Sequence, residues 1–497
     1  MTDAVLHIAR VVVETATPLS ISTGNPDGNF DTRLVTDAND LPAIPGSSLA
    51  GVMRHLYAGL DAVDEQRLND VFGFQDRNLG QASSLAVSWG VMLDSQGRAV
   101  EGLLSPDSER LSDPLIAEAR RLTREAPAFR HRVAINDKGA AADTGKFDRA
   151  VLPTGYRFAL ELRFREDKDS GIWQDLLGLL HHPGFRLGGG TRAGLGKLRV
   201  CSVHARSFTL RESARALQQL PAGLHETDGL EDITGACQGY RPNDQGWQDG
   251  RLILKPRGAW RIGAGHHSVA ELLGQDGPEA ANTMLPVTEG WVRWEKGKAQ
   301  IVRHKGKRLL VPGSSLKGAL RHRFIYYANC LAGRWAEDGQ GKGIPEEVKP
   351  LFGELKGDGS GQAGRLYLDD SYLSLDKVKS CILPHNSIDR FTGGVRDRVL
   401  FAEEVISGAA LQMPIRVNVR PIESLEDTGL RQRIIQALKL TLDDLCEGRL
   451  AFGARTTSGN GFFEGELSGS LRDWLDKQAG PAADSEKAQP QSMEESA

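Results

Sequence analysis

The chain contains 497 residues, which is about three times the length of a typical domain, so the sequence predicts two or three domains rather than one small module. Hydrophobic residues make up 40% and charged residues 25% of the chain, and these ordinary proportions exclude a mainly disordered, collagen-like or coiled-coil protein. The formal net charge of −4 neither indicates nor excludes a nucleic-acid partner. No apolar run approaches the ~18 residues of a membrane span, so we expect a soluble, cytoplasmic protein without a membrane partner.

The cysteines and histidines do not follow the spacing of a known metal site. The chain has five cysteines and no CxxC pair, which argues against a disulfide framework or a zinc site with thiolate ligands. Its 12 histidines include no HExxH motif. We therefore expect reduced cysteines and no zinc.

The elements predicted for the first half begin with a strand, because the segment MTDAVLHIARVVVE alternates polar and apolar residues. A polar, turn-rich loop follows at 31–41. The Pro-Gly-Ser-Ser sequence at 45–48 then predicts a helix N-terminus capped by Ser47 or Ser48. Apolar residues after this turn share one helical face: Leu49, Val52, Met53, Leu56 and Leu60.

Strands and helices alternate through the rest of the chain. Period-two alternation predicts strands at 158–164, 197–203 and 411–419. Helical periodicity predicts helices at 173–182, 316–327 and 430–446. This order predicts an α+β fold, compatible with a ferredoxin-like core that carries insertions.

Three sequence blocks occur twice in the same order, which indicates a duplication. The block PGSSLAGVMRH at 45–55 returns as PGSSLKGALRH at 312–322. The other pairs are 131–155 with 385–408, and 187–196 with 452–461. The duplication predicts the following division of the chain: a first domain at 1–205, a linker at 206–250, a second domain at 251–477 and a disordered tail at 478–497.

Both Gly-Ser-Ser turns are candidate phosphate sites, because a helix N-terminus presents free N–H groups at the positive end of the helix dipole. The candidates for RNA-backbone binding from these turns and their helices are Gly46, Ser47, Ser48, Arg54, Gly313, Ser314, Ser315, Lys317 and Arg321. The two Gly-rich loops add Arg192, Lys197 and Arg455, on a backbone with little side-chain bulk. The alternative explanation is structural: the serines cap helices and the glycines form tight turns.

Two charged segments are further candidates. An acidic loop precedes the first turn and contains Asp27, Asp31, Asp37 and Asp40. A carboxylate there could meet a bound phosphate directly or through a divalent cation, whereas the alternative is an exposed turn. The segment 293–308 contains seven Lys or Arg residues against one Glu, and it predicts either a nucleic-acid contact or an exposed hairpin.

Together, these blocks resemble the RAMP superfamily of CRISPR-associated proteins, and in particular the backbone subunit of type III effector complexes. The residues that carry the resemblance in the first half are Ser22, Thr23, Gly24, Asp31, Asp37, Arg54 and the sequence IPGSSLAG at 44–51. The family's IDRxTG hairpin stands at 388–393 and, in a weaker form, at 135–139. Its Gly-rich element stands at 188–196 and 453–461.

The resemblance implies a tandem fusion of two backbone subunits, as in type III-D-like systems. Each half would be a ferredoxin-like, RRM-like RAMP domain that binds guide RNA and inserts a β-hairpin thumb between the guide and a complementary target RNA. The implied thumb residues are Ile135, Phe147, Ile388, Arg390 and Phe391. The implied partners are guide RNA, target RNA and the other subunits of a type III complex.

The resemblance also implies an RNA-cleaving residue. In that family a loop aspartate cleaves target RNA with a divalent cation, here expected to be Mg²⁺, by favouring attack of the 2′-hydroxyl on the adjacent phosphate. Asp31 matches this position as the catalytic residue and metal ligand, with Asp37 as a supporting acid. The second half departs from the pattern, since the sequence Met-Leu-Pro-Val at 284–287 stands where Asp-x-Pro is expected. Ala50 also replaces the family's lysine in the first half.

Three functional hypotheses remain open at this stage. The first is an RNA-guided ribonuclease subunit with one catalytic site, in the first domain. The second is a purely architectural guide-binding subunit without nuclease activity. The third is a guide-maturation endoribonuclease, which would need a histidine-centred site, and no motif marks His55, His131 or His322 for that role.

Overall fold

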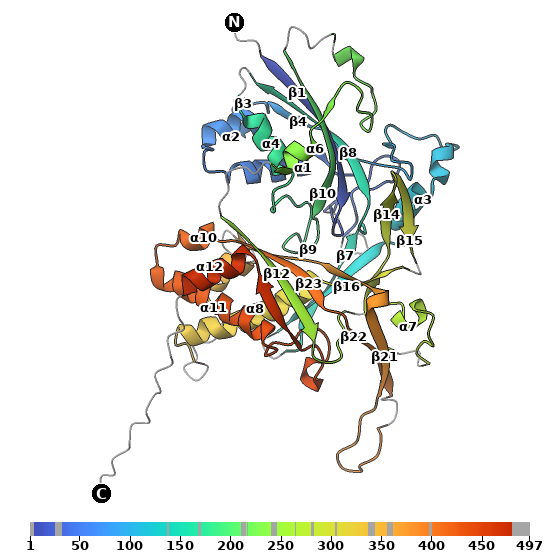
Figure 1. The fold of residues 1–497 in the computed structure, drawn as a ribbon, viewed down its shortest axis with the longest axis vertical. Coiled ribbons are helices and arrows are strands. Elements are labelled where there is room, and N and C mark those ends of the chain that lie inside the picture. The colour runs from blue at the N-terminus through green and yellow to red at the C-terminus, as the bar shows by residue number, and fades with distance from the viewer. Residues whose placement is uncertain are drawn as a thin grey trace.

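We describe the protein from a computed structural model. The residues that it describes are 4–24, 32–136, 139–166, 170–209, 215, 217–239, 246–263, 265–279, 283–303, 306–335, 343–354, 361–396 and 400–479. Two α+β units follow one another along the chain (Figure 1).

The first unit is built on an antiparallel sheet with the spatial order β10-β1-β8-β4. In chain order, its core elements are β1 (Val5–Thr15), α1 (Gly46–Tyr57), β4 (Leu85–Val87), β8 (Arg157–Glu166), α4 (Ile172–Leu179) and β10 (Leu198–Thr209). Its additional elements are α2 (Glu65–Phe72), β2 (Phe74–Asp76), β3 (Leu79–Gln81), β5 (Val91–Met92), α3 (Pro114–Arg124), β6 (Ala128–Ile135), β7 (Ala141–Val151), β9 (Ala193–Gly194), β11 (Glu231–Asp232) and α6 (Thr234–Gly239). The four core strands thus lie in the order fourth, first, third, second.

The second unit repeats this order as β24-β12-β23-β19, again antiparallel. In chain order, its core elements are β12 (Trp247–Pro256), α8 (Gly313–Leu331), β19 (Leu366–Asp369), β23 (Leu411–Asn418), α11 (Thr428–Cys446) and β24 (Phe463–Ser468). Its additional elements are α7 (Val269–Leu272), β13 (Thr288–Glu289), β14 (Trp291–Glu295), β15 (Lys298–Val302), β16 (Arg308–Val311), α9 (Val348–Phe352), β17 (Gly353–Glu354), β18 (Gln362–Ala363), β20 (Ser371–Ser374), β21 (Val378–His385), β22 (Phe401–Gly408), α10 (Arg420–Glu423) and α12 (Ser470–Ala479).

The helices bury the apolar faces that the sequence predicts. In α1, Leu49, Met53 and Leu56 are buried, and α8 buries Leu316, Leu320 and Phe324. In β23 the alternating residues Leu411, Met413, Ile415 and Val417 are buried, as period two requires. None of the helices in the described part of the chain is both long and apolar enough to span a bilayer.

The segment 206–250, expected as a linker, is largely part of the two units. Strand β10 continues to Thr209, β11 pairs with it, and Cys237 of α6 is buried in the first core. Strand β12 already begins at Trp247. The polar, Gly-containing sequence predicts a linker, whereas edge pairing and packing on β10 place residues 231–239 in the first unit. The expected tail at 478–497 begins inside α12, and its residues from 480 onward lie outside the described part of the chain.

A hairpin of the second unit docks on the first unit. We call residues 291–302, strands β14 and β15, the clasp. The indole Nε1 of Trp294 donates to the Gly155 carbonyl over 2.7 Å, and the Arg157 guanidinium lies 4.2 Å from the ring. Val292 is buried in the first unit's core, and a side chain at Gly155 would clash with its carbonyl oxygen. The basic segment 293–308 is therefore in part a contact between the units rather than an exposed hairpin.

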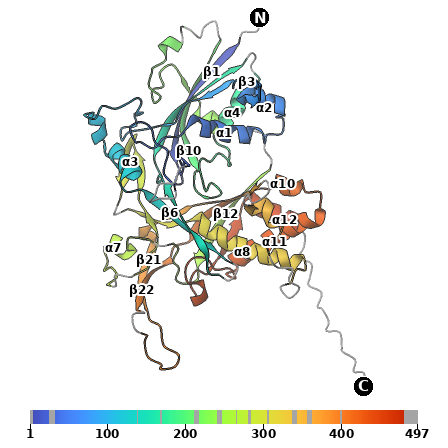
Figure 2. The same ribbon diagram turned by 180° about the vertical axis from the view of Figure 1, so that it is seen from behind.

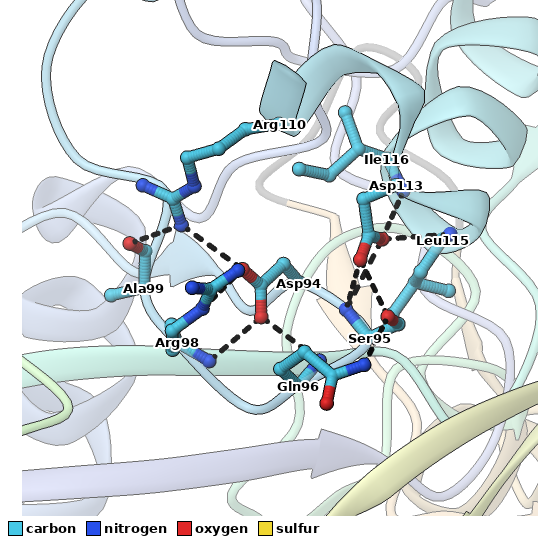
Figure 3. Close-up of polar contacts among 9 residues, drawn as sticks. All are labelled: Asp94, Ser95, Gln96, Arg98, Ala99, Arg110, Asp113, Leu115 and Ile116. Atoms are coloured by element: carbon cyan, nitrogen blue, oxygen red, sulfur yellow. Dashed lines mark hydrogen bonds and ion pairs between the residues drawn. The ribbon is translucent and has the colours of Figure 1, made fainter. Parts of the chain in front are cut away.

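The surface that receives the clasp is held by two carboxylates (Figure 3). Asp94 is fully buried and accepts hydrogen bonds from the backbone N–H of Gln96 and Arg98, and it also pairs with Arg110. Asp113 caps α3 and accepts from Ser95. The Ser95 carbonyl in turn accepts a hydrogen bond from the Ala299 N–H of the clasp at 2.8 Å. Asp94 and Asp113 therefore hold the loop around Ser95 in the position that binds the clasp.

A buried ion-pair network also joins the two units. Arg130 of β6 contacts Glu289 at 3.1 Å and Asp370 at 3.2 Å, both from the second unit. Asp369 pairs in the same way with Arg186 and Lys197 of the first unit. Strand β9 of the first unit adds in parallel to β19, and β6 crosses toward α8 (Figure 2). We call this boundary the seam.

We expect the Arg130→Ala variant to lose about 3–5 kcal/mol of unfolding free energy, because it leaves Glu289 and Asp370 buried without their cation. Urea unfolding followed by tryptophan fluorescence measures this change. The matched control is Arg293→Ala, which removes an exposed pair with Glu295 and should cost about 1 kcal/mol or less. Equal losses in both variants would contradict the seam network.

Candidate nucleic-acid interface

The two Gly-Ser-Ser turns open their helices without serine caps. Pro45 and Pro312 occupy the capping positions, and neither helix has a side-chain capping hydrogen bond, so the predicted serine cap is wrong. The reason is tertiary packing: a side chain at Gly46 would clash with the Val87 carbonyl, and one at Gly313 with the Leu368 carbonyl. Each turn is therefore pressed against the end of a strand.

The first-turn N–H groups are only partly used. The Ser48 N–H donates to the Pro45 carbonyl, and the Ser315 N–H donates to the Pro312 carbonyl, each over 3.0 Å. The N–H groups of Ser47 and Ser314 make no bond to any described residue. In the second turn the Gly313 N–H donates to Asp370 over 2.9 Å, and burial raises the pKa of that carboxyl to about 6. The second turn thus already holds one anion of the protein itself.

A group of cations gathers where the first Gly-rich loop meets α8, and we call Arg132, Arg149, Arg192 and Lys317 the seam cluster. The Lys317 ammonium donates to the carbonyls of Arg192 at 3.1 Å and Leu366 at 2.7 Å. The Arg132 guanidinium donates to the Ala193 carbonyl at 3.2 Å. A side chain at Gly189 would collide with the Arg149 guanidinium, so the glycine lets that cation approach the loop.

No carboxylate of the described residues forms an ion pair with a member of the seam cluster, although the charge of Asp370 acts on Arg132. Burial, with the guanidinium groups of Arg192 and Arg132, lowers the pKa of Lys317 to about 7. Burial also lowers the pKa of Arg132; the nearby Asp370 opposes this effect, and the nearby Arg149 adds to it. In the described part of the chain, the Nε–H groups of Arg149 and Arg192 are buried without a hydrogen-bond partner. Clustered cations with unused donors suit a phosphate backbone.

The sequence predicted half of the seam cluster. Arg192 and Lys317 were candidates, and the structure brings them together from different units. Arg132 and Arg149 were missed, because they lie on the strands of a hairpin whose position across the second unit has no local signal. The one available hint was the alternation of Arg130 and Arg132 along β6.

Two hairpins expose apolar side chains. The first, β6–β7, exposes 47% of Ile135 and 42% of Phe147. The second, β21–β22, projects away from the rest of the molecule (Figure 1), and Phe391 beyond its strands is 99% exposed. Asp389 shapes the tip by accepting from the N–H groups of Phe391 and Thr392. The predicted residues Ile388 and Arg390 are also exposed there.

Comparison with known proteins identifies the family. The family model described as the RAMP superfamily matches residues 12–199 and 260–464, which is most of the chain and both of its units. The chain belongs to the RAMP superfamily. One relative is the "CRISPR system Cms endoribonuclease Csm3" of Methanocaldococcus jannaschii, with 28% identity over 159 residues. That alignment covers 30% of this chain and 61% of the relative, so the chain spans less than two thirds of that protein.

Four other predicted cations of the RAMP domains lie apart from the seam cluster. Arg54 donates to the Gly73 carbonyl and to Asn69, so it holds α1 against the end of α2. Lys197 pairs with Asp369 across the seam. Arg455 lies beside Glu403 at 3.3 Å. Arg321 makes no bond to the described residues, and burial lowers its pKa. Of these four, Arg321 keeps its donors available for a ligand.

The acidic loop of the first RAMP domain is described only in part. Asp31, the predicted catalytic and metal-binding residue, lies outside the described residues, as does Asp27. Asp37 accepts hydrogen bonds from the backbone N–H of Asn39 at 2.8 Å and Leu41 at 3.0 Å, so its carboxylate shapes the turn. The described residues contain no group of three or more His, Cys, Asp or Glu that could hold a metal ion.

We expect Lys317→Met to stabilise the RNA-free protein most at low pH. The folded-state pKa of Lys317, about 7, lies below the ordinary 10.5, so the unfolded chain binds more protons between these values and the parent gains stability as pH rises. The advantage of the variant should therefore shrink by about 2 kcal/mol between pH 7 and pH 9. Urea unfolding at both pH values measures it, with Lys377→Met, at an exposed lysine, as control. A constant advantage would contradict the lowered pKa of Lys317.

Proposed function

We propose that this chain is a backbone subunit of a type III CRISPR effector complex, in which two RAMP domains in tandem bind guide RNA and cleave complementary target RNA. The observation that carries the proposal is the seam cluster, which is built from both domains. RAMP membership supports it, as does similarity to a relative named as a CRISPR endoribonuclease. The strand order fourth, first, third, second supports a ferredoxin-like core in each domain.

The seam cluster would contact the sugar-phosphate backbone of the guide. Its donors are guanidinium and ammonium groups, which bind phosphate without reading the bases. The unused N–H group of Ser47 would add a contact at the N-terminus of α1. A guide held in this way can carry any spacer sequence, and its affinity falls with salt.

The two hairpins would act as the thumbs. Exposed apolar side chains gain free energy when they stack on bases. Phe391 at the second tip and Phe147 on the first hairpin are placed for such contacts. Each hairpin would separate guide and target locally and divide the duplex into segments.

Cleavage would rest on Asp31 of the first domain. The 2′-oxygen attacks the adjacent phosphorus, the bond from phosphorus to the 5′-oxygen breaks, and the 2′-hydroxyl proton must leave, which explains a preference for RNA over DNA. Asp31 would hold a divalent cation, Mg²⁺, which would supply stabilisation of the charge on the phosphate, and the departing 5′-oxygen takes up a proton. Asp37 would support this site indirectly, since it holds the turn at Asn39 and Leu41.

The second domain would bind without cleaving. At the corresponding place Met284 offers no carboxylate, and its backbone is tied to β22 through Ala402 and Glu404. The neighbouring acid Glu289 is buried and neutralised by Arg130. One cut per chain is therefore expected, with any others made by other subunits.

We expect Asp31→Ala in the assembled complex to slow one target cut by about a hundredfold or more, while bound guide and target RNA remain. The seam cluster is untouched by this change. Sequencing the co-purified RNA and mapping the target cuts measures both properties. The matched control is Asp276→Ala, an exposed acid of the second domain, which should change nothing. A cut pattern that survives Asp31→Ala would instead favour a purely architectural subunit.

A further inference from the structure

A cavity of about 620 Å³ lies at the seam, beside the clasp. Its walls come from α3 and β6 of the first domain, and from β13, the clasp and the start of α8 in the second. No member of the seam cluster lines it. The cavity has the size of ordinary small-molecule sites, which span roughly 300–1,000 Å³.

The carboxylates in the cavity wall are already neutralised. Glu118 accepts hydrogen bonds from Arg121 at 2.8 Å and is paired with Arg303, the residue after the clasp. Glu289 is paired with Arg130 and also accepts the Tyr372 hydroxyl at 2.7 Å. Neither acid is therefore left to balance a further cation.

Lys307 is that further cation. It is one of the residues that line the cavity, it is only 9% exposed, and it makes no hydrogen bond or ion pair with any described residue. Burial lowers its pKa. Two more donors on the cavity-lining residues, the Thr288 hydroxyl and the Arg130 Nε–H, are also buried without a hydrogen-bond partner in the described part of the chain. Keeping such groups buried and unpaired is costly unless a ligand supplies acceptors.

The start of α8 opens on the same cavity. This helix has 19 residues, and Ser314 and Ser315 of its first turn are among the lining residues. Its Gly313 N–H is bonded to Asp370, but the Ser314 N–H makes no bond to any described residue and can add a donor beside Lys307. The rest of the lining includes apolar and aromatic side chains, among them Leu122, Tyr156 and Ile301, which would cover an uncharged ligand body.

We propose that this cavity is a second binding site, separate from the RNA interface, that takes a phosphate ester of nucleotide size. Lys307 and the N-terminus of α8 hold the phosphate, the Thr288 hydroxyl donates to it, and the apolar wall covers the rest of the ligand. The phosphate belongs either to a free nucleotide or to an RNA end. The site goes beyond the proposed guide binding, because its residues come from the insertion before α8 and from the seam.

The test is calorimetric titration of the full chain, freed of RNA by nuclease and high salt, with AMP and with inorganic phosphate. We expect both to bind the parent, and Lys307→Met to weaken binding by about tenfold or more, since a charge-assisted hydrogen bond is lost. The matched control is Lys298→Met, at an exposed lysine of the clasp, which should leave AMP binding unchanged. The proposal is overturned if neither probe binds the parent, or if AMP binds Lys307→Met as tightly as the parent.

Two further measurements guard against a folding artefact. Lys307→Met removes a buried, unpaired charge, so without ligand it should melt no lower than the parent, and AMP should raise the melting temperature of the parent alone. Thr288→Val, which keeps the side-chain shape, should also weaken AMP binding. An unchanged AMP affinity in Thr288→Val together with an equal AMP shift in Lys307→Met would refute the site.

Competition with RNA distinguishes the two phosphate sources. Displacement of AMP by a short RNA with a 5′-phosphate, but not by the same RNA with a 5′-hydroxyl, identifies an RNA end as the ligand. Displacement by neither RNA identifies a free nucleotide. Equal displacement by both would place AMP on the RNA interface and overturn the separate site. Guide binding by Lys307→Met, measured in parallel, should equal that of the parent, so failure of this site and failure of the proposed function are distinguishable.

Discussion

Buried carboxylates of the second RAMP domain find their cations in the first. The side chains of Asp369 and Asp370 are only 4% and 1% exposed, and their partners are Arg186 and Arg130. A carboxylate that is buried without a cation destabilises a protein strongly, so these pairs fix how the two domains meet. The clasp adds apolar burial through Val292 to the same boundary. The tandem chain is thereby one assembled unit rather than two domains on a tether.

The boundary between the domains also determines where the seam cluster, the proposed RNA-binding group, lies. The Lys317 ammonium can donate to the Arg192 carbonyl only because the first Gly-rich loop is held against α8. Strand β9 extends the second sheet beside this loop. The repulsion among these cations is a cost that the seam pairs offset in the absence of RNA. Guide RNA would relieve it, so the same contacts that stabilise the chain would also prepare the site.

Local patterns in the sequence predicted the local structure well. Periodicity placed the buried faces of α1 and β23, and the repeated Gly-Ser-Ser blocks predicted the duplication that the RAMP match confirms. Contacts between distant residues were not predictable: Arg130 and Asp370 lie 240 positions apart. The serine caps were wrong for the same reason, since packing of Gly46 on Val87 is a tertiary constraint. The role of Asp31 remains a prediction, because that residue lies outside the described part of the chain.

The most direct test of the account is the salt dependence of guide binding by a variant that carries Arg132→Gln and Arg192→Gln. The account predicts weaker binding for every spacer sequence, by about 1 kcal/mol or more for each charge removed, and a salt slope that falls by about one per lost phosphate contact. The control is Arg257→Gln, at an exposed arginine paired with Glu464, which should leave the guide affinity and the salt slope unchanged. An unchanged slope in the double variant would contradict the claim that RNA binds at the seam.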